Sequence, residues 1–404
     1  MRVSTANTYD IGIAALQRRQ GEMSDAQNSL TSGKRVTKAS DDPVAAARAE
    51  RALAGAARVK ASERTVEASQ TVMIQTESSL GDAGELLQQA REAIVAAGNA
   101  TYGDPERAAL AAKIKTIREQ LFKVANRSDG AGTFLFGGQG STLPPLVDSR
   151  PDVSQPIEQT GVRFIGSRGT STTDSATNLP LGMDGKAVWM SARTGNGVFE
   201  TRVVSATQGG WIDAGQVTDP NALTGNSYSV VYNAGTGAFD ITNTTTGTAL
   251  APQPFVAGQA IERDGMAFTI SGTPTNGETY QILPSRSTLN VFGTLDKAVA
   301  DLSAGKAGAG LTQSIGDNLR NMDSVLGKLA AARATSGEAL SRIESEASQL
   351  ATQKLNHQTE RANAEDLDMV SAISEFQNKQ SGYDAALKSY SLVQRMSLFQ
   401  YVSV

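Results

Sequence analysis

Residues that commonly carry catalysis or bind metals are scarce in this sequence. Its 404 residues include no cysteine and one histidine, His357. Thiolate metal sites and cysteine nucleophiles are therefore excluded, and no second imidazole exists to share a metal or a proton relay. His357 stands between Asn356 and Gln358 in a polar helical stretch, so we interpret it as a solvated or interfacial side chain. We expect no catalytic residues, no cofactor and no metal, and hence no enzyme.

Carboxylates occur in close groups, which is one requirement for acid–base catalysis. The groups are Asp41 with Asp42, and Glu365 with Asp366 and Asp368. Such groups begin helices far more often than they move protons. Asp42 precedes Pro43, and proline fits the first turn of a helix because the N–H it lacks would have no partner there. The pair Asp42 and Pro43 therefore predicts a capped helix start.

The glycine-rich and basic segments give weaker signals. The stretch GAGTFLFGG at residues 130–138 does not have the spacing of a dinucleotide loop, so we interpret its glycines as turns. The cluster Lys34, Arg35 and Lys38 is either a solvated loop or a contact with acidic groups of a neighbouring subunit. With 37 basic against 41 acidic residues and a net charge of -4, the chain lacks the basic excess expected of a nucleic-acid-binding protein.

Both ends of the chain carry apolar or neutral residues in alternating steps of three and four, the period of a coiled coil. We call these positions the terminal stripes. They include Tyr9, Ile13, Leu16, Met23 and Leu30 near one end and Met369, Ile373, Phe376, Tyr383, Leu387 and Tyr390 near the other. Five further apolar residues, Ile11, Val370, Leu392, Met396 and Phe399, lie off the stripes. Pairing of the two ends would leave these five in water, so we expect additional subunits to cover them.

The inner parts of both arms predict a second set of paired helices. In the first arm a large residue recurs every seven positions, at Val59, Val66, Met73, Leu80, Leu87 and Ile94, with a small one three positions later. In the second arm the same period runs from Ile315 to Leu350, and Arg333 and Ser336 are predicted to interrupt it. Asp104 and Pro105 predict the capped start of a further helix that folds back on the one before it.

The middle of the chain, from about residue 130 to 284, changes to Gly, Thr, Asn and Pro with short β-branched and aromatic runs. Residues 229–232 and 239–242 around the turn NAGTG predict a hairpin, and Asp264-Gly265 predicts a second turn. Trp189 and Trp211 are expected to be packing residues of this middle domain. No run of 18 apolar residues predicts a membrane span, and the first residues lack the apolar region of a Sec signal.

Two segments resemble the flagellin superfamily. SLTSGKRVTKASDDPVAAARAERA, residues 29–52, resembles the flagellin N-terminal signature, and residues 365–402, from EDLDMVSAISEF to SLFQYV, resemble its C-terminal helix. The opening MRVSTANTYD, the Pro43-Val44-Ala45 run and the FLFGG at residues 134–138 are most similar to the hook-associated proteins at the junction of flagellar hook and filament.

The resemblance implies a mainly α fold with a β-rich insertion and both chain ends paired. The expected parts are an inner coiled coil (1–38 with 360–404), a helical bundle (39–139 with 286–359) and a β-rich outer domain (140–285). The terminal stripes would form the assembly surface of a helical array of identical subunits. The implied role is a structural subunit, secreted through flagellar type III export with a cytosolic chaperone, that contacts another hook-associated protein and flagellin. Flagellin itself, a coiled-coil receptor fragment and an enzyme hidden in the middle domain are the alternatives.

Overall fold

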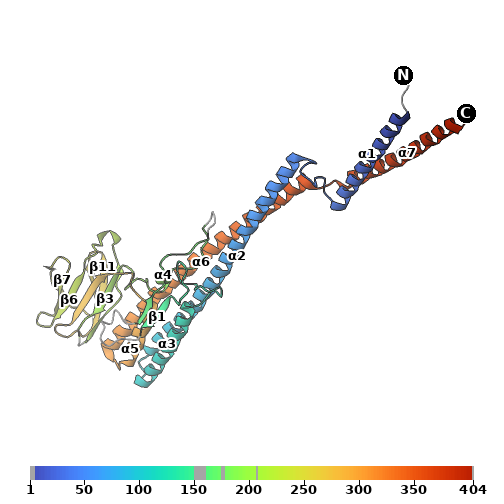
Figure 1. Cartoon of the computed structure of the whole chain (residues 1–404). Helices are drawn as coiled ribbons and strands as arrows, with labels where there is room; N and C mark the ends of the chain where they lie inside the picture. Colours follow the sequence, from blue (N-terminus) through green and yellow to red (C-terminus); the bar gives the residue numbers. More distant parts are fainter. Residues whose placement is uncertain (1–4, 150–160, 174–177, 206–207, 403–404) are drawn as a thin grey trace. The chain divides into compact units, whose positions relative to one another are not determined.

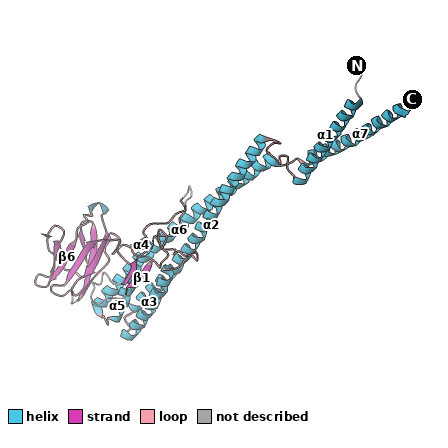
Figure 2. Ribbon diagram, viewed as in Figure 1, coloured by secondary structure: helices cyan, strands magenta, loops and turns pink. Residues whose placement is uncertain are grey.

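The computed structural model describes residues 5–149, 161–173, 178–205 and 208–402, with side chains described from residue 10 to residue 392 within these ranges. Contacts divide the chain into two compact units, one of residues 1–64 with 346–404 and one of residues 65–345. The predicted order of helices, then strands, then helices is confirmed (Figure 2). Among the described residues no helix combines the length and apolar character needed to cross a bilayer.

The first unit contains the two ends of the chain. Helices α1 (Thr5–Ser32) and α7 (Met369–Val402) lie side by side and run in opposite directions (Figure 1). The unit also holds the first part of α2 (Pro43–Ala97) and the last part of α6 (Gly308–Glu365). The segments that connect α1 to α2 and α6 to α7 are joined by main-chain hydrogen bonds, from Arg35 N to Glu365 O (2.7 Å) and from Leu367 N to Gly33 O (3.0 Å).

The second unit has a helical core built along α2 and α6. The predicted large positions of α2 from Val66 to Ile94 are at most 5% exposed, and the small ones from Ser69 to Ala97 are fully buried. The facing positions of α6 recur every seven residues in the same way, at Met322, Leu329, Ser336 and Ile343. We call this contact the α2–α6 seam, and its heptad prediction is confirmed.

Ser336 corrects one detail of that prediction. It does not interrupt the seam, because its side chain is completely buried there and its hydroxyl donates to the carbonyl of Met73. A serine opposite the bulky Met73 leaves space for close approach of the helices, and its hydrogen bond offsets the cost of burying the hydroxyl. Arg333 does point away from the seam and forms a 2.6 Å ion pair with Glu77.

Helix α3 (Asp104–Ala125) folds back on α2 as predicted, since Arg107 donates to Ala97 O and Arg127 pairs with Asp82. Its cap differs from the prediction: the residue before the helix is Gly103, whose N–H donates to the Glu106 carboxylate (2.9 Å), while Asp104 is already helical. Helix α5 (Val291–Ser303), the short α4 (Gly185–Trp189) and the hairpin of β1 (Leu146–Ser149) and β2 (Gly161–Phe164) complete this core.

The β region forms two antiparallel sheets around a separate apolar core. One sheet has the order β3 (Phe199–Val203), β12 (Thr279–Pro284), β6 (Tyr228–Asn233), β7 (Ala238–Asn243) and β8 (Thr248–Ala249), with β9 (Gln253–Pro254) also on β7. The other has the order β10 (Ala260–Arg263), β11 (Met266–Gly272) and β4 (Gly210–Ile212), with β5 (Gln216–Val217) on β11. A short 3-10 helix spans Pro220–Ala222.

Both turn predictions in this region are confirmed. β6 and β7 pair from Tyr228 with Asn243 to Asn233 with Ala238. β10 and β11 are joined by Asp264 and Gly265, which both have positive φ, as a two-residue hairpin turn requires. One of the two tryptophans differs from expectation. Trp189 is buried in the helical core between Phe136 and Phe292, whereas Trp211 is half-buried in β4.

Candidate assembly surface

The terminal stripes lie on α1 and α7, and they are only partly covered. In α1, Leu16, Met23 and Leu30 are half-buried, while Ile13 is exposed. In α7, Phe376, Tyr383 and Tyr390 are half-buried, while Met369, Ile373 and Leu387 are between 43% and 46% exposed. The side chain of Tyr9 lies outside the described part. Among the described side chains of these two helices none is buried, so the pair has no closed core of its own.

The residues off the stripes are more exposed still. Ile11 is 62% exposed, Val370 78% and Leu392 61%, which confirms the prediction that they stay in water in a single chain. Met396 and Phe399 lie outside the described side chains. An apolar surface of this kind, spread over two paired helices, is typical of a protein interface.

Small residues set the contact between α1 and α7. A Cβ on Gly12 would lie 3.3 Å from the ring of Tyr390, and one on Gly382 would lie 2.5 Å from the Arg19 guanidinium. Tyr390 and Arg19 therefore pack directly over glycine backbone on the opposite helix. These contacts fix which residues of the two helices lie opposite one another at these two positions.

Residues of the loop between α1 and α2 mark the end of one helix and the start of the next. Gly33 takes a left-handed conformation (φ 68°) directly after α1, as a glycine does at a helix C-terminus. Asp42 Oδ1 accepts hydrogen bonds from the N–H groups of Val44 (3.1 Å) and Ala45 (3.0 Å), the geometry of an N-cap for the helix that starts at Pro43. The bond from Ala45 and the ion pair with Arg35 lower the pKa of Asp42 below its usual range.

Of the three basic residues in this loop, two form ion pairs with acidic residues of the same chain. Lys34 Nζ lies 2.7 Å from Glu365, and Arg35 lies 3.2 Å from Asp42 and also donates to Ala364 O. The Lys34 hydrogen bond keeps the pKa of Glu365 low. Neither alternative from the sequence describes Lys34 and Arg35 fully, because each is partly exposed and each has an acidic partner in its own subunit. Asp368 caps α7 by accepting from the N–H groups of Val370 and Ser371, so this member of the second carboxylate group stabilises a helix start.

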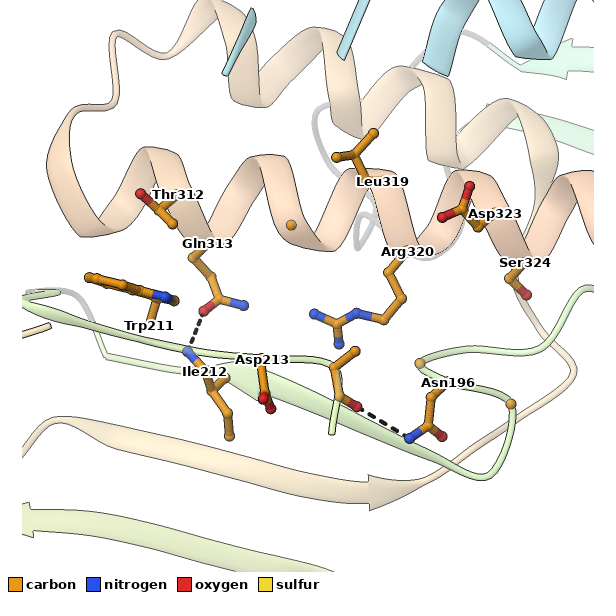
Figure 3. Close-up of a pocket in the computed structure, with 14 residues that line it drawn as sticks. Asn196, Trp211, Ile212, Asp213, Thr312, Gln313, Leu319, Arg320, Asp323 and Ser324 are labelled. Atoms are coloured by element: carbon orange, nitrogen blue, oxygen red, sulfur yellow. Dashed lines mark hydrogen bonds between the residues drawn. The ribbon is translucent and has the colours of Figure 1, made fainter. Parts of the chain in front are cut away.

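A cavity of about 650 Å³ lies between α6 and the β region, and it is large enough to hold a small substrate (Figure 3). Its polar side chains are bonded within the fold: Gln313 accepts from Ile212 N (2.8 Å), and Asn196 donates to Ala214 O (3.2 Å). The hydroxyls of Thr312 and Ser324 donate to main-chain carbonyls. Around this cavity the described residues therefore provide no activated nucleophile, and its hydrogen bonds connect the β region to α6.

Two buried polar clusters in the second unit were not found by sequence reasoning. Glu278, 1% exposed, accepts from the N–H groups of Gly209, Gly210 and Thr275 and from the Tyr280 hydroxyl. Burial and this carboxylate both raise the pKa of Tyr280. Asp301 binds Lys297 and Lys306 at 2.6 Å each and Asn318 at 3.0 Å. Among the described residues no three acidic or imidazole groups gather closely enough to hold a metal ion.

Comparison with known proteins places this architecture in a family. The model of the bacterial flagellin N-terminal helical region matches residues 3–141, and that of the bacterial flagellin C-terminal helical region matches residues 319–402. The two matches together cover more than half of the chain and contain both members of the α1–α7 pair. The chain therefore belongs to the flagellin superfamily.

Within that superfamily the similarity is to hook-associated protein 3. The chain is 32% identical over 198 residues to the Flagellar hook-associated protein 3 of Salmonella typhimurium, which covers 46% of this chain and 62% of the relative. The match thus spans less than two thirds of that relative's length.

Solved structures show the same fold. Xanthomonas campestris FlgL superposes with a TM-score of 0.66 at 24% identity, over 76% of this chain and 99% of that one. The flagellar junction protein FlgL from Legionella pneumophila gives 0.63 at 22% identity, over 71% and 96%. The predicted fold class, flagellin-like helical ends around a β-rich middle, is confirmed.

Proposed function

We propose that this protein is a structural subunit of the bacterial flagellum that joins hook and filament. The observation that carries the proposal is the α1–α7 pair, which has the flagellin terminal regions but leaves its apolar stripes half open within one chain. Covering them with neighbouring copies stabilises the assembly by removing apolar surface from water. A contact between two different surfaces, repeated with a constant rotation, builds a ring or a short helical turn.

The proposed neighbours are another hook-associated protein on one side and flagellin on the other. The three-part division of the sequence assigns residues 1–38 with 360–404 to the inner coiled coil, 39–139 with 286–359 to the bundle and 140–285 to the outer domain. The protein reaches its place by flagellar type III export, held before export by a cytosolic chaperone. It acts by binding, without catalysis.

Deletion of the gene is the direct test. Cells without this protein should retain hooks but lose attached filaments, and should release flagellin into the medium. Re-expression of the parent chain should restore filaments. Filaments of normal length and number on the deletion strain would contradict the proposal.

Flagellin itself is the second candidate from the same superfamily. Counting copies in purified flagella separates the two functions, because a filament protein is needed in thousands and a junction subunit only for about one turn of the array. Quantitative mass spectrometry against a labelled standard should give the smaller number.

A further inference from the structure

An arginine-lined groove lies where the beginning of α2 meets the end of α6 in the first unit. Its volume is about 540 Å³. Its walls carry three guanidinium groups (Arg35, Arg48 and Arg51), two carboxylates (Asp42 and Glu360), one amide and three small or apolar side chains that include Val44. We call it the arginine groove.

The positive charge of this groove is not balanced within the chain. Asp42 already pairs with Arg35 and caps α2, and Glu360 is 69% exposed and lies 3.5 Å from His357. Neither Arg48 nor Arg51 forms an ion pair with any residue that the structure describes. Guanidinium groups that share one concavity repel one another, and a carboxylate placed between them removes that repulsion through paired hydrogen bonds.

The charges of α2 are unevenly distributed along its length. Residues 43–64 contain five basic and two acidic residues, whereas residues 65–97 contain one basic and five acidic residues. The helix dipole favours acidic residues in the first turn of a helix and basic residues in the last turn, and neither end turn of α2 holds a charged residue. The helix dipole therefore does not explain this distribution.

The complementary charge is a row of carboxylates further along α2. Glu77 and Asp82 pair with Arg333 and Arg127, but no residue in the described part forms an ion pair with Glu67, Glu85 or Glu92. These three are exposed, and their separations of 18 and 7 residues place them on one face of a helix with 3.6 residues per turn. Ile74, which is 52% exposed, lies on the same face. We call this face the acidic stripe.

We propose that the arginine groove of one copy binds the acidic stripe of a second copy. Arg48 and Arg51 receive the Glu85 and Glu92 carboxylates, and Val44, 63% exposed, packs on an apolar residue of the partner. Groove and stripe are different surfaces of the chain, so the contact is head-to-tail and leaves a free groove and a free stripe for the next copies. The inference rests on the proposed function, and it assigns a contact outside the terminal stripes to the same assembly.

Charge exchange between purified full-length proteins tests the proposal. Variant R48E/R51E reverses the groove, and variant E85R/E92R reverses the stripe. Self-association measured by sedimentation at low salt should weaken about tenfold or more in each variant alone. An equimolar mixture of the two should associate like the parent, because every contact then again joins opposite charges. Variant K113E/K115E changes the net charge by the same amount as R48E/R51E, but at exposed positions of α3. It should associate like the parent.

Several results would overturn the proposal: parent-like association of either variant, no recovery in the mixture, or no association of the parent at low salt.

Thermal unfolding by circular dichroism shows whether each variant is folded. Variant R48Q/R51Q, which replaces both arginines with neutral residues, should weaken association less than R48E/R51E. The experiments distinguish an incorrect groove–stripe contact from an incorrect junction function. In the first case the charge variants restore filaments to the deletion strain fully, and in the second the deletion strain never loses its filaments.

Discussion

The α2–α6 seam and the α1–α7 pair have the same heptad pattern and different packing. In the seam, Met73, Leu80, Leu87 and Ile94 are at most 2% exposed, and α3, α5 and the short β1–β2 hairpin add to the same core. In the α1–α7 pair, every described stripe residue keeps part of its surface in water. A heptad repeat thus predicts that two helices meet, and additional layers decide whether the contact becomes a core.

The largest expected effect on stability comes from shortening a buried side chain of the α2–α6 seam. Leu87→Ala should lower the free energy of unfolding by about 2–5 kcal/mol, because Leu87 is fully buried and its removal leaves a cavity. The matched change on α1, Ile13→Ala, removes a side chain that is 42% exposed and should cost less than about 1 kcal/mol in the monomer. Urea unfolding followed by circular dichroism measures both. Similar losses of unfolding free energy in the two variants would contradict the difference in packing between the seam and the α1–α7 pair.

A smaller effect concerns the stability of the second unit at low pH. Burial alone would raise the pKa of Asp301, but hydrogen bonds from Lys297 and Lys306 outweigh it and lower the pKa below the ordinary value. The unfolded chain then binds this proton more readily, so the stabilisation is complete above about pH 4 and is lost as pH falls through the folded-state pKa.

Asp301→Asn tests that dependence. The variant should be less stable at pH 7 by about 1–3 kcal/mol, since a buried charge-assisted bond is weakened, and should lose less stability than the parent on acidification below about pH 4. Unfolding curves at a series of pH values provide the measurement. Parallel acid profiles for variant and parent would show that Asp301 does not contribute.

The smallest effect concerns the exposed start of α2. Asp42→Ala removes the acceptor of the Val44 and Ala45 N–H groups and should lower the melting temperature slightly, by less than Leu87→Ala. Asp42→Asn loses the charge facing Arg35 but keeps a capping oxygen, so it is the matched control and should stay near the parent. If alanine and asparagine have equal effects, the ion pair rather than the cap stabilises this end.

The fold could be predicted from the sequence wherever one residue pattern repeats along an element. The spacing from Val66 to Ile94 indicated which side of α2 is buried, and Asp264-Gly265 indicated a hairpin turn. Ser336 was misjudged because a polar residue interrupts a pattern of side-chain types, although a small hydroxyl that bonds to the Met73 carbonyl fits the seam. Trp189 was assigned to the wrong core because its partners, Phe136 and Phe292, are distant in sequence.

The candidate assembly surface was predictable in part. The residues of the terminal stripes could be predicted from their heptad spacing. The exposure of Ile11, Val370 and Leu392 followed from their positions outside the stripes. The buried cluster around Glu278 could not be predicted, because its donors come from Gly209, Gly210 and Thr275 on separate segments. The pairing of Lys34 with Glu365 and the hydrogen bond from Arg35 to Ala364 O likewise depend on the return of the chain at residues 364–366.

Hydrogen exchange tests most directly the claim that the α1–α7 pair is completed only by neighbouring copies. In the dilute monomer, amides of α1 and α7 should exchange quickly, because a pair without a closed core opens at little cost, while amides of residues 66–94 and 322–343 should stay protected. In assembled flagella the amides of α1 and α7 should become protected as well. Equal protection of both regions in the monomer would contradict the account.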